Sequence, residues 1–188
     1  MMICLSYQYK NLQSYFYSLE KIQKNCSQRE KEILYEQKVK IGIKMHSDTL
    51  WCTRYCQLTC SAVITGQIVV NITVLVLLMM QMVNTDRTLT NTLPIVTMGM
   101  TLLVTTGVFM CNAGDITIEA HKLGTAIYFS GWENCQEESS GRIKELLLVA
   151  MMLSQKPTEI KSHNIIELSY QSYLKIVKSS YSIFSVLY

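Results

Sequence analysis

The chain has 188 residues, with 17 Lys and Arg against 14 Asp and Glu, and 49% of its residues are hydrophobic. Charged residues make up only 16%, well below the roughly 25% typical of soluble domains, and none falls within residues 55–85 or 88–114. About 20 mostly apolar residues suffice to cross a bilayer as a helix. The composition therefore indicates an all-α integral membrane protein in contact with the lipid bilayer, and it excludes a soluble enzyme. A net charge of only +3, without a basic, aromatic-rich face, also argues against nucleic acid as a partner.

Residues 1–54 are rich in charge, with nine Lys and Arg and five Asp and Glu. From Arg29 to Lys44 the charged side chains alternate with apolar ones, a pattern typical of amphipathic helices. We expect one or two such helices here, lying outside the lipid.

Two membrane spans are predicted within residues 55–114, at about 58–83 and 93–111. The second span has Pro94 in its first turn, where the missing N–H of proline costs nothing. A short polar loop, residues 84–92, joins the two spans. So short a loop predicts an antiparallel transmembrane hairpin.

The basic residues predict the orientation of this hairpin. Lys and Arg number nine before the first span, one in the loop and five in residues 112–164, which follow the second span. The positive-inside bias therefore places both flanks in the cytoplasm and the loop outside. Residues 115–164 are then a cytoplasmic region, in which residues 143–153 form a helix too short to span and ended by Lys156-Pro157.

The last segment, residues 165–188, would reach about 36 Å as a helix, enough to cross the bilayer a third time. Its polar side chains share one helical face: Ser172, Lys175, Ser179 and Ser182. On the opposite face, where packing is expected, the side chains are apolar or aromatic: Leu174, Val177, Tyr181, Phe184 and Tyr188. Ionisable residues at bilayer depth nearly always face a bundle interior or a water-filled path. The pattern predicts a pore-lining helix, with a tail lying on the membrane surface as the alternative.

Other polar positions have two readings each. Cys52, Cys56 and Cys60 line one helical face, which fits palmitoylation at the membrane surface or, as we prefer, packing of small side chains. Gln67 and Asn71 share a face of the first span, where hydrogen bonding between helices is favoured over a ligand site.

The second span has a threonine stripe at residues 97, 101 and 105, for which hydrogen bonding and an extracellular cavity are equally good readings. The three histidines stand alone, without a partner one turn away, so we expect no metal. The sequence also lacks the common nucleophile, phosphate-binding and zinc-protease motifs, so we expect no enzyme activity and no cofactor.

Several blocks in the last third of the chain are similar, in order and spacing, to the insect odorant receptor family. They are residues 126–132 (Ala-Ile-Tyr-Phe-Ser-Gly-Trp), 146–148 (Leu-Leu-Leu), 155–160 (Gln-Lys-Pro-Thr-Glu-Ile), Leu168-Ser169 and 176–187. The resemblance is close over about residues 120–188 and looser over 40–119. We find nothing diagnostic in residues 1–39.

The resemblance implies a subunit of an odorant-gated, nonselective cation channel in the plasma membrane. Members of the family have seven transmembrane helices, a cytoplasmic N-terminus and an extracellular C-terminus, and they form tetramers with a shared co-receptor. On this reading the two spans resemble the fifth and sixth helices. Residues 143–153 resemble the cytoplasmic half of the broken seventh helix, in the anchor between subunits, and residues 169–188 its pore-lining half.

The resemblance also implies roles for particular residues. The pore-lining set is Ser172, Lys175, Ser179, Ser182 and Val186, with Val186 near the gate. The odorant-pocket set, at the outer end of the second span, is Met98, Thr101 and Thr105. The anchor and assembly set is Trp132, Leu147, Gln155, Lys156 and Pro157.

Two departures from the family pattern stand out. Four of the seven helices have no counterpart, which suggests a truncated form, and Ser162-His163 occupies a turn where the family usually has a small residue and a glycine. The alternatives are a stand-alone assembly or regulatory subunit of the membrane, or a G-protein-coupled chemoreceptor. The latter is disfavoured because such receptors keep their C-terminus in the cytoplasm, opposite to the predicted orientation.

Overall fold

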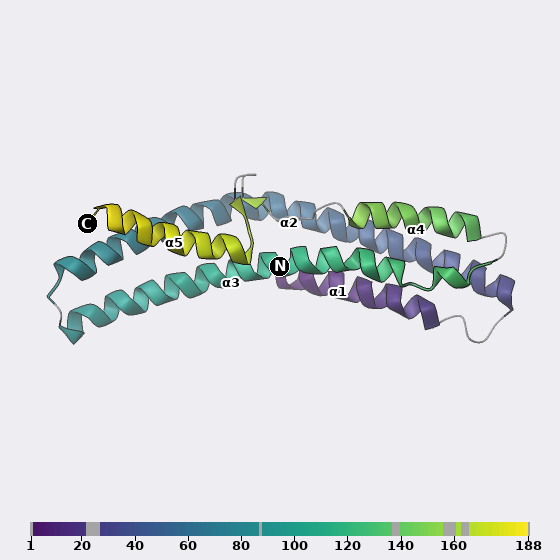
Figure 1. Cartoon of the computed structure of the whole chain (residues 1–188), viewed down its shortest axis with the longest axis horizontal. Coiled ribbons are helices and arrows are strands. Elements are labelled where there is room, and N and C mark those ends of the chain that lie inside the picture. The colour runs from purple at the N-terminus through teal and green to yellow at the C-terminus, as the bar shows by residue number, and fades with distance from the viewer. Residues whose placement is uncertain are drawn as a thin grey trace. The chain divides into compact units, whose positions relative to one another are not determined.

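The computed structural model describes residues 2–21, 27–86, 88–136, 140–155, 161–162 and 166–187. They form α1 (Met2–Leu19), α2 (Gln28–Asn84), α3 (Leu89–Tyr128), the short 3-10 helix η2 (Trp132–Asn134), α4 (Ser140–Ser154) and α5 (Tyr170–Leu187) (Figure 1). The described part of the chain otherwise has only a two-residue antiparallel pair, β1 (Lys161–Ser162) with β2 (Ile166–Glu167), in which Lys161 lies opposite Glu167. The predicted all-helical class is confirmed.

The two longest helices far exceed the thickness of a bilayer. At 57 and 40 residues, α2 and α3 are roughly 85 and 60 Å long, against about 30 Å for the hydrocarbon core. Among the described residues, these two helices contain stretches long and apolar enough to cross a membrane. The predicted amphipathic region, residues 1–54, and the predicted span at about 58–83 are not separated by a break in the helix, because α2 runs from Gln28 to Asn84.

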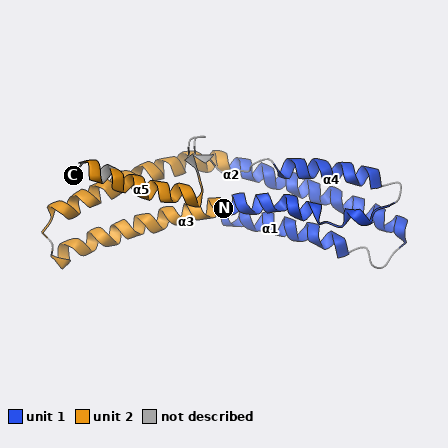
Figure 2. Cartoon of the chain, in the orientation of Figure 1, with its two compact units in different colours: residues 1–56, 115–158 blue, residues 57–114, 159–188 orange. Residues whose placement is uncertain are grey.

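Two compact units divide the chain (Figure 2). Unit 1 comprises residues 1–56 and 115–158, and unit 2 comprises residues 57–114 and 159–188. The predicted division into residues 1–54, 55–114, 115–164 and 165–188 assigns each segment to the cytoplasm or to the membrane. The two units are defined by internal packing, which does not test that assignment, so the division stays a prediction.

Unit 1 packs α1, the first part of α2, the end of α3 and α4 around one core. Along α1 the buried apolar residues recur every three or four positions, so one face is buried: Leu5, Tyr9, Leu12, Phe16 and Leu19. At Gly42 of α2 an added Cβ would lie 2.8 Å from the Phe16 ring. The absence of a side chain at Gly42 therefore lets α1 and α2 approach closely.

The turn that ends α3 depends on a second glycine. Gly131 has φ +88°, in the left-handed region that disfavours residues with a Cβ, and it precedes η2. A Cβ there would also lie 3.0 Å from the Cα of Glu20. Gly131 thus reverses the chain beside the end of α1.

Unit 2 packs the second part of α2, the first part of α3, and α5. Tyr173 of α5 donates a hydrogen bond to the carbonyl of Leu103 at 3.2 Å, and its ring lies over Gly107 of α3. Tyr170 packs over Gly114 in the same way. Small residues at these positions let α5 lie close against α3, as is common where helices meet in membranes.

Candidate functional sites

The polar face predicted for α5 is uncovered in the structure. Lys175, Ser179 and Ser182 are exposed, Val186 near the end of the helix is 84% exposed, and Ser172 is half-buried. By contrast, Ile176 is buried and Ser180 is only 1% exposed. The helix therefore presents a charged and hydroxyl-rich side that the rest of unit 2 does not cover.

Two residues of the packing face predicted for α5 do not pack within unit 2. Leu174 and Tyr181, expected to pack, are exposed, whereas the helix packs through a third side that includes Tyr173, Ile176 and Ser180. Gly107 and Gly114 explain this orientation, because the absence of a side chain at each lets the rings of Tyr173 and Tyr170 pack against α3. The side chain of Phe184 and all of Tyr188 lie outside what the structure describes.

The predicted odorant-pocket residues form an exposed row on α3. Met98, Thr101 and Thr105 are all exposed, and both threonine hydroxyls donate 2.8 Å hydrogen bonds to carbonyls one turn earlier. A small cavity of about 60 Å³ in unit 2 is lined by other residues, namely Val63, Ile64, Gln67, Ile68, Thr106, Phe109 and Met110. The pocket role of the row stays a prediction.

Hydrogen bonding between α2 and α3, preferred for the Gln67–Asn71 pair, is confirmed. Gln67 donates to the side-chain oxygen of Asn71 at 2.9 Å, and the Asn71 amide donates to the hydroxyl of Thr106 on α3. That hydroxyl donates in turn to the carbonyl of Leu102 at 2.8 Å. The buried polar groups are thus joined in one network across the helix pair.

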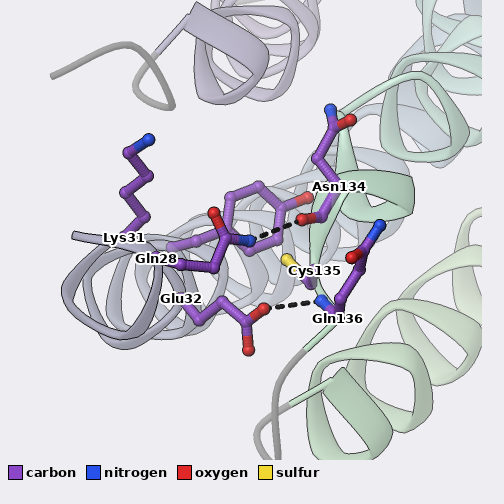
Figure 3. A pocket seen from close by; sticks show the side chains of 7 residues that line it. Gln28, Lys31, Glu32, Asn134, Cys135 and Gln136 are labelled. Carbon is purple, nitrogen blue, oxygen red and sulfur yellow. Dashed lines mark hydrogen bonds between the residues drawn. The ribbon is translucent and has the colours of Figure 1, made fainter. Parts of the chain in front are cut away.

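A polar hollow of about 300 Å³ lies in unit 1, between the start of α2 and the segment around η2 (Figure 3). Its lining is Gln28, Lys31, Glu32 and Tyr35 from α2, with Asn134, Cys135 and Gln136. Gln28 donates to the carbonyl of Asn134 at 3.0 Å, and the buried Glu32 accepts from the backbone N–H of Gln136 at 2.6 Å. These bonds fasten α2 to the segment that follows α3.

Two groups at this hollow are kept protonated. Burial raises the pKa of Tyr35 to about 12, and the Tyr35 hydroxyl lies 2.8 Å from the hydroxyl of Ser130. Burial, with the nearby carboxylate of Glu32, raises the pKa of the Cys135 thiol to about 11. A thiol protonated at neutral pH is a poor nucleophile. The thiol is therefore poorly suited to covalent chemistry, and the hydrogen bonds at the hollow hold α2 to the segment that follows α3. Nothing in the charge-alternating sequence marked Glu32 as buried.

The predicted anchor residues are divided between core and surface. Trp132 is half-buried; its indole N–H donates to the carbonyl of Tyr128 at 3.0 Å, and the ammonium of Lys144 lies 6.0 Å from the centre of its ring. Leu147 is buried in the core of unit 1, and Gln155 is exposed. Lys156, Pro157 and His163 lie outside the described residues.

The cysteine stripe on α2 is only partly accessible. Cys56 is buried, whereas Cys52 and Cys60 are half-buried. Packing therefore explains Cys56 better than palmitoylation does. Among the described residues, no three His, Cys, Asp or Glu side chains come together as a metal site would require.

The described residues are almost entirely helical, and two long helices contain apolar stretches that are mostly exposed, which fits an α-helical membrane protein. The family described as 7tm Odorant receptor matches residues 1–181, and the chain belongs to this family. The chain is also 35% identical over 82 residues to Odorant receptor 67c of Drosophila melanogaster, a match that covers 43% of this chain and 19% of that protein.

These comparisons confirm the family that the sequence blocks suggested. They also correct one statement, because the family match begins at residue 1 and includes residues 1–39, in which we found nothing diagnostic.

Proposed function

We propose that this chain is part of an odorant receptor subunit, which binds odorants and then conducts cations without strong selectivity. The subunit would act as a heterotetramer with a shared co-receptor. Membership of the odorant receptor family supports the sensory role. The observation that supports conduction is the uncovered polar face of α5, defined by Lys175, Ser179 and Ser182.

The energetics favour water over lipid on this face. A lysine facing lipid near the centre of a bilayer costs about 2.5–3.5 kcal/mol on insertion scales, and a water-filled path removes most of that cost. Facing α5 helices from several subunits would enclose such a path. Val186, exposed beyond the polar residues, would add an apolar ring suited to gating by dewetting.

We place the subunit in the plasma membrane with the N-terminal segment in the cytoplasm and Tyr188 outside. The support is the distribution of Lys and Arg, with nine before the hairpin and five in residues 112–164 against one in the hairpin loop. Odorants would bind against the exposed row of Met98, Thr101 and Thr105 on α3, which would form one wall of a larger pocket.

Assembly would involve the outer side of α4. Leu147 is buried, so it stabilises unit 1 from within, while its neighbours Leu148, Val149 and Met152 are exposed and apolar. An exposed apolar row on a helix outside the lipid is suited to a subunit contact. Trp132 and Gln155 would lie near that contact.

The test is whole-cell recording from a complete receptor with this C-terminal segment, expressed with its co-receptor. Lys175→Glu should change cation selectivity, because a charge on the pore wall acts directly on passing ions. Lys178→Glu, at an exposed lysine about 60° around the helix and at the edge of the polar face, should change selectivity less. Val186→Ser should raise the basal leak. Unchanged selectivity in Lys175→Glu, together with unchanged leak in Val186→Ser, would refute the pore role of α5.

A further inference from the structure

Two aromatic rings lie exposed side by side on α2. The ring centroids of Trp51 and Tyr55 are 4.2 Å apart, and the two side chains are 61% and 52% exposed. The two rings form an exposed aromatic strip on the outside of α2.

The strip lies opposite the packed side of α2. Thr53 and Cys56 are buried, and the Thr53 hydroxyl lies 3.0 Å from the hydroxyl of Tyr9 on α1. Because the inner side of α2 is occupied by α1 at this level, the rings face away from unit 1. Whatever covers Trp51 and Tyr55 must come from outside it.

The sequence changes character at this point. Arg54, exposed between the two rings, is the last charged residue before the uncharged stretch of residues 55–85. Indole and phenol rings concentrate at the boundary between headgroups and acyl chains, where the ring body is in lipid and its N–H or O–H reaches polar groups. Arginine beside them can extend its charged end to lipid phosphates.

The length of α2 beyond the rings matches a bilayer. From Tyr55 to Asn84 the helix has about 30 residues and is roughly 45 Å long, close to the 40–45 Å thickness of a bilayer that includes both headgroup regions. Rings at one headgroup region would therefore place the end of α2 in the other. If α2 instead entered the bilayer well before Lys44, the charged side chains that follow would lie in the lipid.

The aromatic arrangement recurs within unit 2. Tyr170, at the start of α5, is exposed and packs beside Gly114 of α3. Gly114 is the last residue before Asp115, the first charge after the uncharged stretch of α3. There too, an exposed ring stands where an uncharged stretch ends.

We propose that Trp51, Tyr55 and Arg54 form a lipid-contact site at the cytoplasmic headgroup region, which sets the depth at which α2 enters the bilayer. The occupant is the phospholipid surface itself, with ring bodies among the upper acyl chains and Arg54 at the phosphates. This inference requires α2 to cross the bilayer and is independent of conduction through α5.

The chain offers a direct test, because Trp51 and Trp132 are its two tryptophans. Trp132→Phe leaves Trp51 as the reporter, and Trp51→Phe leaves Trp132 as the matched control. Each purified chain is placed in phosphatidylcholine vesicles whose acyl chains are brominated either near the headgroup or near the chain end. Bromine quenches indole fluorescence only at close range.

Trp51 should be quenched at least about twice as strongly by the shallow bromine as by the deep one, while Trp132 should be quenched little by either. Quenching of Trp51 no greater than that of Trp132 would overturn the proposal, and would point to a second protein subunit as the cover. Stronger quenching by the deep bromine would overturn the proposed depth. Should Trp132→Phe lose its helical circular dichroism, the difference in quenching between wild type and Trp51→Phe reports the same quantity.

Discussion

Tyr35 shows how a single hydroxyl joins distant parts of unit 1. It contacts both the hydroxyl of Ser130, at 2.8 Å, and the carbonyl of Ser130, at 3.2 Å, in a buried environment. Tyr35→Phe should lower the free energy of unfolding of unit 1 by about 1–2 kcal/mol, because a buried acceptor loses its donor. Thermal unfolding in detergent measures this. Tyr17→Phe, at an exposed tyrosine, is the control and should change little; equal losses in both variants would contradict the argument.

The buried side chain of His46 makes the stability of unit 1 depend on pH. The ring is buried in unit 1, and burial lowers its pKa below the ordinary value of 6.5. The unfolded chain therefore binds the proton more readily, so stability is full above about pH 6.5 and falls as the pH drops below it.

Melting temperatures at about pH 8 and about pH 6 should differ more in the wild type than in His46→Gln, whose side chain does not titrate. His121, exposed on α3, supplies the control: His121→Gln should keep the wild-type slope. If the melting temperature of His46→Gln differs between the two pH values as much as that of the wild type, other groups cause the pH dependence.

The sequence pattern predicted the partners or burial of some residues and missed those of others, in each case for a physical reason. The Asn71 bond to Thr106 was foreseeable, because an amide in an apolar span must find a partner. The burial of Glu32 was not, because its partner Gln136 lies 104 residues away and the local sequence looks like a solvated helix. Leu147 was assigned to a subunit contact by motif, although only the packing of α4 decides which of its leucines face inward.

At the scale of elements, composition located the apolar stretches but not the ends of the helices. Charge marked residue 55 as a boundary, yet α2 continues through it, since no proline or glycine pair interrupts the helix there. On α5 the polar face was correctly grouped by helical spacing. Its packing side was not, because that side depends on Gly107 and Gly114 of α3, far away in the sequence.

The docking of α5 on α3 can be tested through Gly107. A Cβ there would lie 3.3 Å from the Tyr173 ring, so the larger side chain of Gly107→Val should displace α5 and cost about 1–3 kcal/mol through overpacking. Gly99→Val on the same helix is the control, because its nearest neighbour would be 4.0 Å away. Thermal stability in detergent compares the two. Equal tolerance of both substitutions would mean that Tyr173 does not fix the position of α5.

Cation conduction by the assembled receptor would require one particular side of α5 to meet water. Ser179 and Ser180 are neighbours in sequence, but Ser179 is exposed whereas Ser180 is buried and donates to the carbonyl of Ile176 at 2.9 Å. Chemically identical side chains thus lie on the exposed side and on the packed side of α5. Substitution of either serine by cysteine would change the size of the side chain only slightly.

The most direct measurement is block of odorant-evoked current by a charged, water-soluble thiol reagent. It would be made on a complete receptor with this C-terminal segment and either Ser179→Cys or Ser180→Cys. A water-filled path along the Lys175 face predicts that the reagent reduces the current irreversibly in Ser179→Cys and leaves Ser180→Cys as sensitive as the unsubstituted receptor. Block of Ser180→Cys alone, or no block of Ser179→Cys despite a normal odorant response, would contradict the assignment of this face to the ion path.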